Sequence, residues 1–212
     1  MRARWIAGSA AVLAAAGAAA FYLASGAYDF GADSPHWGIT RAAIEAFRDH
    51  SIAVRSQDVV VPDFRDERMV SKGAGQYAAM CVNCHLAPGM NDSEIRPGLY
   101  PQPPNLSETR VDPKRAFWVV KHGLKMSGMP AWGLGHDDDA LWSIVAFVTR
   151  LPGLSEEHYK QMVAEAIAKH IPAFERYVPP PRKPWMSEDS RMGLFDAAAL
   201  GLVFFQNAAG AA

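Results

Sequence analysis

Cys81-Val82-Asn83-Cys84-His85 holds the only two cysteines of the 212-residue chain, and the rest of the sequence is best understood from this segment outward. The histidine follows the second cysteine directly, so two thiols and an imidazole lie within one short segment. On a helix, a spacing of three places both sulfur atoms on the same face, with the imidazole beside them. This pentapeptide is therefore the first candidate for chemistry.

A C-x-x-C-H run is the attachment signature of a c-type haem, whose vinyl groups react with both thiols while the histidine binds the iron. Three other interpretations fit the cysteine pair alone. A structural zinc site needs four ligands, a dithiol redox motif needs a βαβ context, and a plain disulfide needs neither. The chain has no second cysteine pair and its surroundings read as helical, so one covalent haem c at Cys81 and Cys84 is favoured, with His85 on the iron.

A haem of this kind takes a second axial ligand, and a Met/His pair raises its potential into a range suited to electron transfer. Met129 is the preferred candidate because it precedes Pro130 in an irregular loop and has no helical face to fill. The alternatives are Met126 in the same loop, and then His122 and His136.

Residues 5–27 carry no charge and follow Arg2 and Arg4. A helix of this length reaches roughly 34 Å, enough to cross a hydrocarbon core of about 30 Å. The segment is therefore predicted to be a transmembrane anchor, with residues 1–4 in the cytoplasm and the rest of the chain exported. A cleaved signal peptide stays open as the alternative, because small residues occupy 25–27.

Apolar residues at spacings of three and four predict helices near 66–80, 112–122 and 138–150. Met69 and Met80 fall among the apolar positions of the first helix and are expected to fill the core. The loops between these helices are too long for a bundle of this size unless something fills its middle.

The flanking segments read less clearly. Residues 28–65 are interpreted as a linker with a short helix at 35–50, followed by a strand or an extended stretch at 59–61. Residues 153–171 are predicted to be an amphipathic helix. The tail, 172–212, is rich in proline and then apolar, and the sequence suggests no role for it.

Charge excludes one class of function. The chain carries 21 basic and 22 acidic residues and no basic stripe, so we expect no nucleic-acid partner. No nucleophile triad, phosphate-binding glycine loop or metalloprotease helix is present in the sequence. An electron carrier rather than an enzyme is therefore expected, with a peroxidase-like haem enzyme that has a displaceable sixth ligand as the alternative.

Side chains that donate hydrogen bonds or carry positive charge near the motifs are candidates for binding haem propionates or a partner protein. Haem propionates need hydrogen-bond donors, although solvated surface positions are favoured for the four candidates, Arg96, Lys114, Arg115 and Trp118. Lys121 and Lys125 flank the methionine loop and are candidates for docking an acidic partner.

Several motifs occur together in a recognisable order. They are Gly73-x-x-x-Tyr77-x-x-x-Cys81-x-x-Cys84-His85, Pro104-Asn105-Leu106, Met129-Pro130-Ala131-Trp132 and Ile144-Val145-Ala146-Phe147-Val148. Over roughly 66–152 the chain resembles a class I c-type cytochrome, and as a whole it resembles the membrane-anchored bacterial monohaem type. The resemblance implies an all-α class I cytochrome c fold around one covalent haem, preceded by a transmembrane helix.

The resemblance also implies roles for particular residues. The carbonyl of Pro104 would accept a hydrogen bond from His85, with Pro88 as a less favoured alternative, and Leu106 would pack on the haem face. Gly73 would lie against Phe147 or Trp142. The implied function is a single-electron carrier tethered to the bacterial inner membrane. Its haem domain would lie in the periplasm and exchange electrons with redox partner proteins in a respiratory or dehydrogenase chain.

Overall fold

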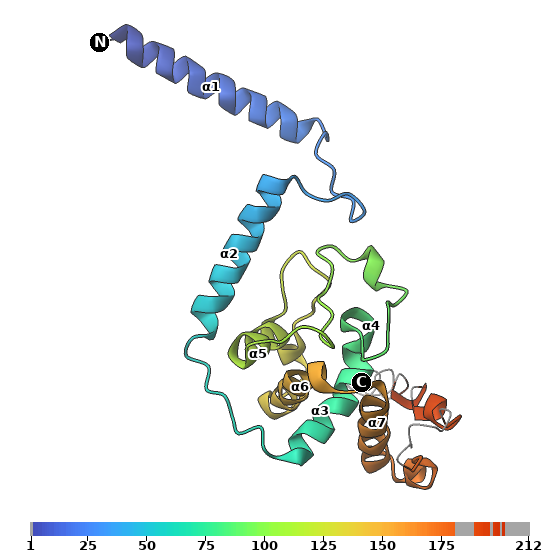
Figure 1. Ribbon diagram of the computed structural model, residues 1–212. Coiled ribbons are helices and arrows are strands. Elements are labelled where there is room, and N and C mark those ends of the chain that lie inside the picture. Colours follow the sequence, from blue (N-terminus) through green and yellow to red (C-terminus); the bar gives the residue numbers. More distant parts are fainter. Residues whose placement is uncertain (1, 181–188, 196, 200, 202–212) are drawn as a thin grey trace. The chain divides into compact units, whose positions relative to one another are not determined.

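The computed structural model describes residues 2–180, 189–195, 197–199 and 201, with side chains from Gly8 onward. Every regular element in this part of the chain is helical (Figure 1). Two compact units are present, residues 1–37 and 38–212. The last part of the apolar tail, residues 202–212, lies outside the described residues.

The first unit contains helix α1, Arg2–Ala24, and the turns that follow it. Tyr28 organises these turns, because its hydroxyl lies 2.7 Å from Nδ1 of His36 and its ring packs edge-on against Phe30 and Trp37. Among the described residues, no helix is both long enough and apolar enough to cross a membrane.

Helix α3, Glu67–Met80, and helix α6, Asp138–Arg150, form the centre of the second unit. The carboxylate of Asp66 caps α3 by accepting a hydrogen bond from the Arg68 backbone, and the carboxylate of Asp137 caps α6 in the same way. Both helices therefore begin where the sequence predicts.

The two helices cross where α3 has a glycine. A β-carbon at Gly73 would lie 1.9 Å from the Ser143 carbonyl oxygen and 2.9 Å from Cβ of Phe147. Only a residue without a side chain allows this approach. Of the two expected neighbours of Gly73, the structure therefore selects Phe147, while Trp142 stacks on Phe117 with ring centroids 4.0 Å apart.

Helix α5, Pro113–His122, packs against α6 and is capped by Asp112. Gly123 ends it with a φ of 65°, a conformation that favours glycine. Helix α2, Gly38–Ser56, packs against α5 and extends further along the chain than predicted. Residues 59–61, predicted as a strand or an extended stretch, form no strand in the structure.

Helix α7, Glu156–His170, covers α3 on its other side (Figure 1). A β-carbon at Gly75 would lie 3.2 Å from Cβ of Ala166, so the two helices approach closely there. The remaining short elements are α4 (Val82–His85), η1 (Arg96–Gly98), η2 (Trp132–Leu134), η3 (Leu151–Gly153) and η4 (Pro172–Tyr177).

Candidate functional site

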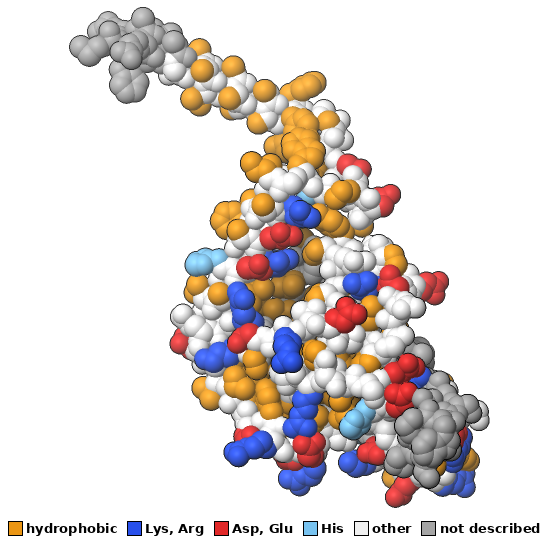
Figure 2. Space-filling model, in the orientation of Figure 1, with side chains coloured by type: hydrophobic (Ala, Val, Ile, Leu, Met, Phe, Trp, Pro, Cys, Tyr) orange, Lys and Arg blue, Asp and Glu red, His pale blue; other side chains and the backbone are white. Residues whose placement is uncertain are grey.

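A cavity of about 550 Å³ lies between the helices of the second unit. Its walls are formed by helix α2, by the junction between α3 and α4, by helices α5 and α6, and by the loop that follows α5. Figure 2 shows the hollow with hydrophobic side chains inside and charged side chains at its rim. The space that the long loops predicted in the middle of the bundle is therefore present.

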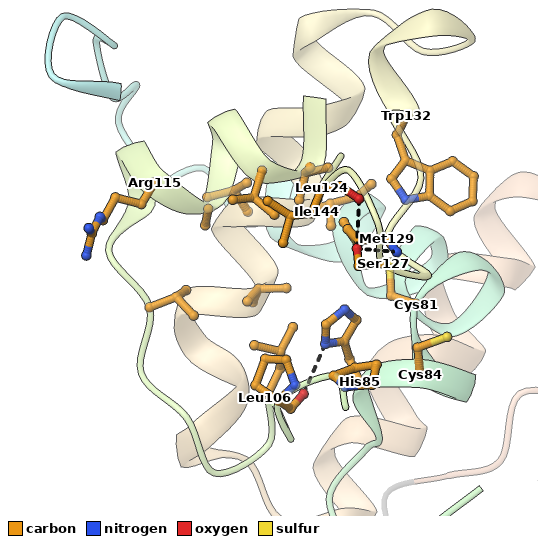
Figure 3. A pocket seen from close by; sticks show the side chains of 18 of the residues that line it. Cys81, Cys84, His85, Leu106, Arg115, Leu124, Ser127, Met129, Trp132 and Ile144 are labelled. Carbon is orange, nitrogen blue, oxygen red and sulfur yellow. Dashed lines mark hydrogen bonds between the residues drawn. The ribbon is translucent and has the colours of Figure 1, made fainter. Parts of the chain in front are cut away.

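Both cysteines and the histidine of the motif line this cavity. Helix α3 ends at Cys81, whose amide donates to the Tyr77 carbonyl, and the next turn begins at once. The amides of Cys84 and His85 donate to the Cys81 carbonyl at 3.1 and 2.9 Å. This tight turn brings the three side chains to one wall, and both thiols are free (Figure 3).

The thiols are held in their neutral form. Burial raises the pKa of Cys81 to about 12, and the neighbouring Cys84 adds to the shift. Burial also raises the pKa of Cys84. In the described part of the chain, no three His, Cys, Asp or Glu side chains gather as a metal-binding cluster.

The imidazole of His85 points into the cavity, and its Nδ1 lies 3.0 Å from the Pro104 carbonyl oxygen (Figure 3). Burial lowers the pKa of His85, although the Pro104 hydrogen bond opposes the shift. A neutral ring that donates from Nδ1 leaves Nε2 as the ligand atom. The carbonyl partner is thus that of Pro104, and Pro88 has no part in this hydrogen bond.

The chain turns sharply after the histidine. Leu86 is buried and has a φ of 60° and a ψ of 167°, a conformation that costs energy for a residue with a side chain. The buried Tyr77 hydroxyl donates to the Leu86 carbonyl at 2.5 Å and holds this turn. The Leu106 amide donates to the His85 carbonyl at 2.9 Å, and the Leu106 side chain lines the cavity. The sequence pattern included Tyr77 but gave no sign of this hydrogen bond.

The loop after α5 is closed by three hydrogen bonds. The Leu124 amide donates to the Met129 carbonyl at 3.1 Å. The Ser127 hydroxyl donates to the Leu124 carbonyl at 2.8 Å and accepts from the Met129 amide at 3.2 Å. The loop is therefore ordered by hydrogen bonds among its own residues, and Met129 lines the cavity (Figure 3). Ser127 is a positioning residue that sequence reasoning missed.

The alternative ligands lie in different surroundings. Met126 has 79% of its surface exposed, and His122 is also exposed. Nδ1 of His136 lies 3.2 Å from the Trp132 carbonyl oxygen, and this histidine does not line the cavity. Met80 packs on the core as expected, but it also lines the cavity near His85.

Three arginines line the cavity: Arg48, Arg110 and Arg115. Arg48 belongs to α2 and is paired with Asp49 at 2.8 Å, while a guanidinium nitrogen of Arg115 donates to the Asp49 carbonyl at 3.1 Å. Helix α2, which the sequence places in a linker, therefore forms part of the cavity wall. Among the described residues, Arg110 has no hydrogen bond or ion pair.

Arg96 is less exposed than the sequence suggests, whereas the hydrogen bond of Lys114 lies at the surface. The side chain of Arg96 has only 15% of its surface exposed, because its guanidinium donates to the Pro103 carbonyl and pairs with Asp92. The ammonium of Lys114 donates to the Gln57 carbonyl at 2.8 Å and so ties α5 to the end of α2. Neither side chain lines the cavity.

The cavity has the properties that a c-type haem requires. Its volume falls within the usual range of roughly 300–1,000 Å³ for cofactor sites. Two neighbouring thiols, one oriented imidazole and two thioethers line the cavity together with apolar side chains, and charged side chains stand at its rim. Such a donor set would allow both covalent attachment of a haem and axial ligation of its iron.

Fold and site together define a cytochrome c domain. Residues 68–148 match the family model of cytochrome c oxidase, cbb3-type, subunit III, and this part of the chain is a cytochrome c domain of that family. Comparisons with curated proteins and with solved structures gave no match. Helices α2 and α7 lie outside the matched segment.

Proposed function

We propose that the protein is a single-electron carrier with one haem c, attached through Cys81 and Cys84 and ligated by His85 and Met129. The observation that carries this proposal is that all four side chains line one cavity of a cytochrome c domain. A bound haem would supply the one-electron chemistry. The chain's own contribution is to hold the ligands and limit access of water.

Met129 is the preferred sixth ligand on three grounds. It reaches the cavity from the loop after α5, whereas His85 comes from α4, so the two enter from separate segments (Figure 3). The hydrogen bonds of Ser127 fix its backbone, so little entropy is lost on binding. Met80 is a weaker candidate because it directly precedes Cys81, on the element that carries the attachment site.

The arginines at the cavity are the propionate partners in this proposal. Guanidinium groups bind carboxylates through paired hydrogen bonds, and Arg110 is not engaged by another described residue. Arg48 and Arg115 bring α2 into the site. A positive charge near the iron stabilises the reduced haem relative to the oxidised haem, which carries one more positive charge. Arg110→Gln removes such a charge and should therefore lower the reduction potential in a potentiometric titration. An unchanged potential would remove Arg110 from the propionate site.

Location belongs to the same proposal. Residues 5–27 tether the protein to the bacterial inner membrane, and the haem domain, residues 66–152, lies in the periplasm. The uncharged stretch after Arg2 and Arg4 supports this placement. After cell fractionation and a carbonate wash, the haem should stay with the membrane. Release of a mature form beginning near Tyr28 would instead establish a cleaved signal peptide and leave the carrier function untouched.

The partners are expected to be redox proteins of a respiratory or dehydrogenase chain, in agreement with the family that the domain matches. A carrier needs no exchangeable ligand on its iron, whereas a peroxidase-like enzyme does. Carbon monoxide added to the reduced holoprotein at neutral pH should therefore fail to bind. Rapid binding would favour the enzyme.

Three methionine variants test the ligand. Met129→Ala should abolish the weak sulfur-to-iron band at the red end of the oxidised spectrum, lower the potential and admit carbon monoxide. Met126→Ala and Met80→Ala are the matched controls, and both should keep the band. Loss of the band in only one of these controls would transfer the ligand role to that methionine.

A further inference from the structure

A second groove, of about 720 Å³, lies between α3 and α7. It differs sharply in charge from the chain as a whole, which has 21 basic and 22 acidic residues. The groove is lined by Arg68, Lys72 and Lys169 and by two histidines, and no Asp or Glu lines it. Such a local excess of cations attracts an acidic ligand.

The acidic side chains near the groove are paired. Asp66, the N-cap of α3, pairs with Arg68 at 3.2 Å, so the unpaired positive charge of the groove comes from its lysines. Glu67 pairs with Arg150, outside the groove, at 2.8 Å. Gln161 donates to Glu165 at 2.9 Å. Lys72 and Lys169 are both exposed. The Lys169 ammonium donates one hydrogen bond, to the Ser71 hydroxyl at 3.4 Å, and keeps two further N–H donors for a ligand.

The floor of the groove suits a peptide better than a small anion. Gly75, Ala79 and Ala166 leave room because their side chains are small or absent. The side-chain oxygen of Gln76 is buried and has no hydrogen-bond partner among the described residues. A peptide offers a backbone N–H to that oxygen as well as carboxylates to the lysines, whereas a simple anion offers only acceptors.

The groove lies close to the proposed haem cavity. Met80 lines both cavities, so one side chain separates them. His136 lines the groove, and its ring lies 5.7 Å from that of Trp132, which lines the haem cavity. An electron could therefore pass between a ligand in the groove and the cavity over one or two side chains.

We infer that the groove between α3 and α7 is the docking site for an acidic segment of a redox partner protein. This inference rests on the proposed electron-carrier function. It moves the docking face away from Lys121 and Lys125, the lysines that the sequence suggested. Lys121 is engaged by Asp138 at 2.7 Å. The α7 side of the groove lies outside the segment that matches the family model.

The test uses the full-length holoprotein and a hexaglutamate peptide that carries a photoexcitable ruthenium tris-bipyridine group. Excited Ru(II) transfers one electron to the ferric haem and becomes Ru(III), and the haem iron becomes ferrous. At low ionic strength, Lys72→Glu/Lys169→Glu should lower the second-order rate constant of this transfer at least about tenfold. The rate should also lose most of its dependence on salt.

Arg41→Glu/Arg55→Glu is the control, because it makes the same change in net charge at exposed positions outside the groove and outside the methionine loop. It should change the rate less than about threefold, as expected from long-range charge alone. Lys72→Gln/Lys169→Gln provides a milder version if the charge reversal prevents folding. Equal losses in the two double variants, or a larger loss in the control, would overturn the inference. A wild-type protein without a haem spectrum would overturn the proposed function before any peptide is added.

Discussion

Gly123 holds the methionine loop in place, and its replacement by alanine gives a prediction with a calculable size. Gly123 has a φ of 65° and a ψ of −172°, a region that essentially only glycine occupies. A β-carbon there would lie 2.7 Å from the Pro130 carbonyl carbon and 2.8 Å from the Met129 carbonyl oxygen. Both contacts are with backbone atoms, which cannot rotate away.

The cost has two parts. The backbone conformation costs about 1–3 kcal/mol for alanine. The contacts with Pro130 and Met129 cost about 1–3 kcal/mol more if the loop stays in place. Gly123→Ala should therefore reduce the free energy of unfolding by about 2–6 kcal/mol, a large part of the roughly 5–15 kcal/mol of a typical domain. If the loop moves instead, the stability loss is smaller, but the hydrogen bond from Leu124 to Met129 is broken.

The assay follows the oxidised spectrum of the holoprotein during urea unfolding. Gly123→Ala should weaken or abolish the sulfur-to-iron band and lower the unfolding midpoint. Gly135→Ala is the matched control, because Gly135 lies beyond the same loop, has a φ of −126° and has no atom within 4 Å of its would-be β-carbon. A Gly123→Ala protein with the band and midpoint of the wild type would refute this reasoning.

Two further predictions concern the core and the turn after the haem motif. Gly73→Ala should destabilise the domain by about 3 kcal/mol or more, because its β-carbon would clash with the Ser143 carbonyl and with Phe147, and calorimetry or urea unfolding measures the loss. A loss below about 1 kcal/mol would show that α3 and α6 can separate freely. Tyr77→Phe should cost about 1–3 kcal/mol in the same assay, because it leaves the buried Leu86 carbonyl without its donor. An unchanged midpoint for Tyr77→Phe would mean that this hydrogen bond does not hold the turn.

The features that the sequence predicts well are local ones. Capping residues such as Asp112 and Asp137 lie next to the helices they start, and Gly123 ends its helix by its own backbone preference. The spacing of the cysteines and the histidine likewise needs only one helical turn. These signals lie in a few adjacent residues, so the helices and the centre of the candidate site follow from them.

The features that it misses depend on distant contacts. Arg115 reaches the Asp49 carbonyl across 66 positions in the chain, and this contact makes α2 a wall of the cavity. Arg96 is expected at the surface but is held in the interior by Pro103. The choice of Phe147 over Trp142 as the neighbour of Gly73 also needed the helix packing. Periodicity and capping contain no information about which distant carbonyl a side chain meets.

The proposed function depends on one haem bound covalently at the cysteine pair. The direct measurement is the mass of the chain, purified from cells with a haem-attachment system, denatured and extracted with acidified acetone, followed by peptide mapping. We predict the mass of the polypeptide plus one haem, with the haem on the peptide that contains Cys81 and Cys84. A mass equal to that of the polypeptide alone would show that no haem is attached to Cys81 and Cys84, and the proposed function would then be wrong.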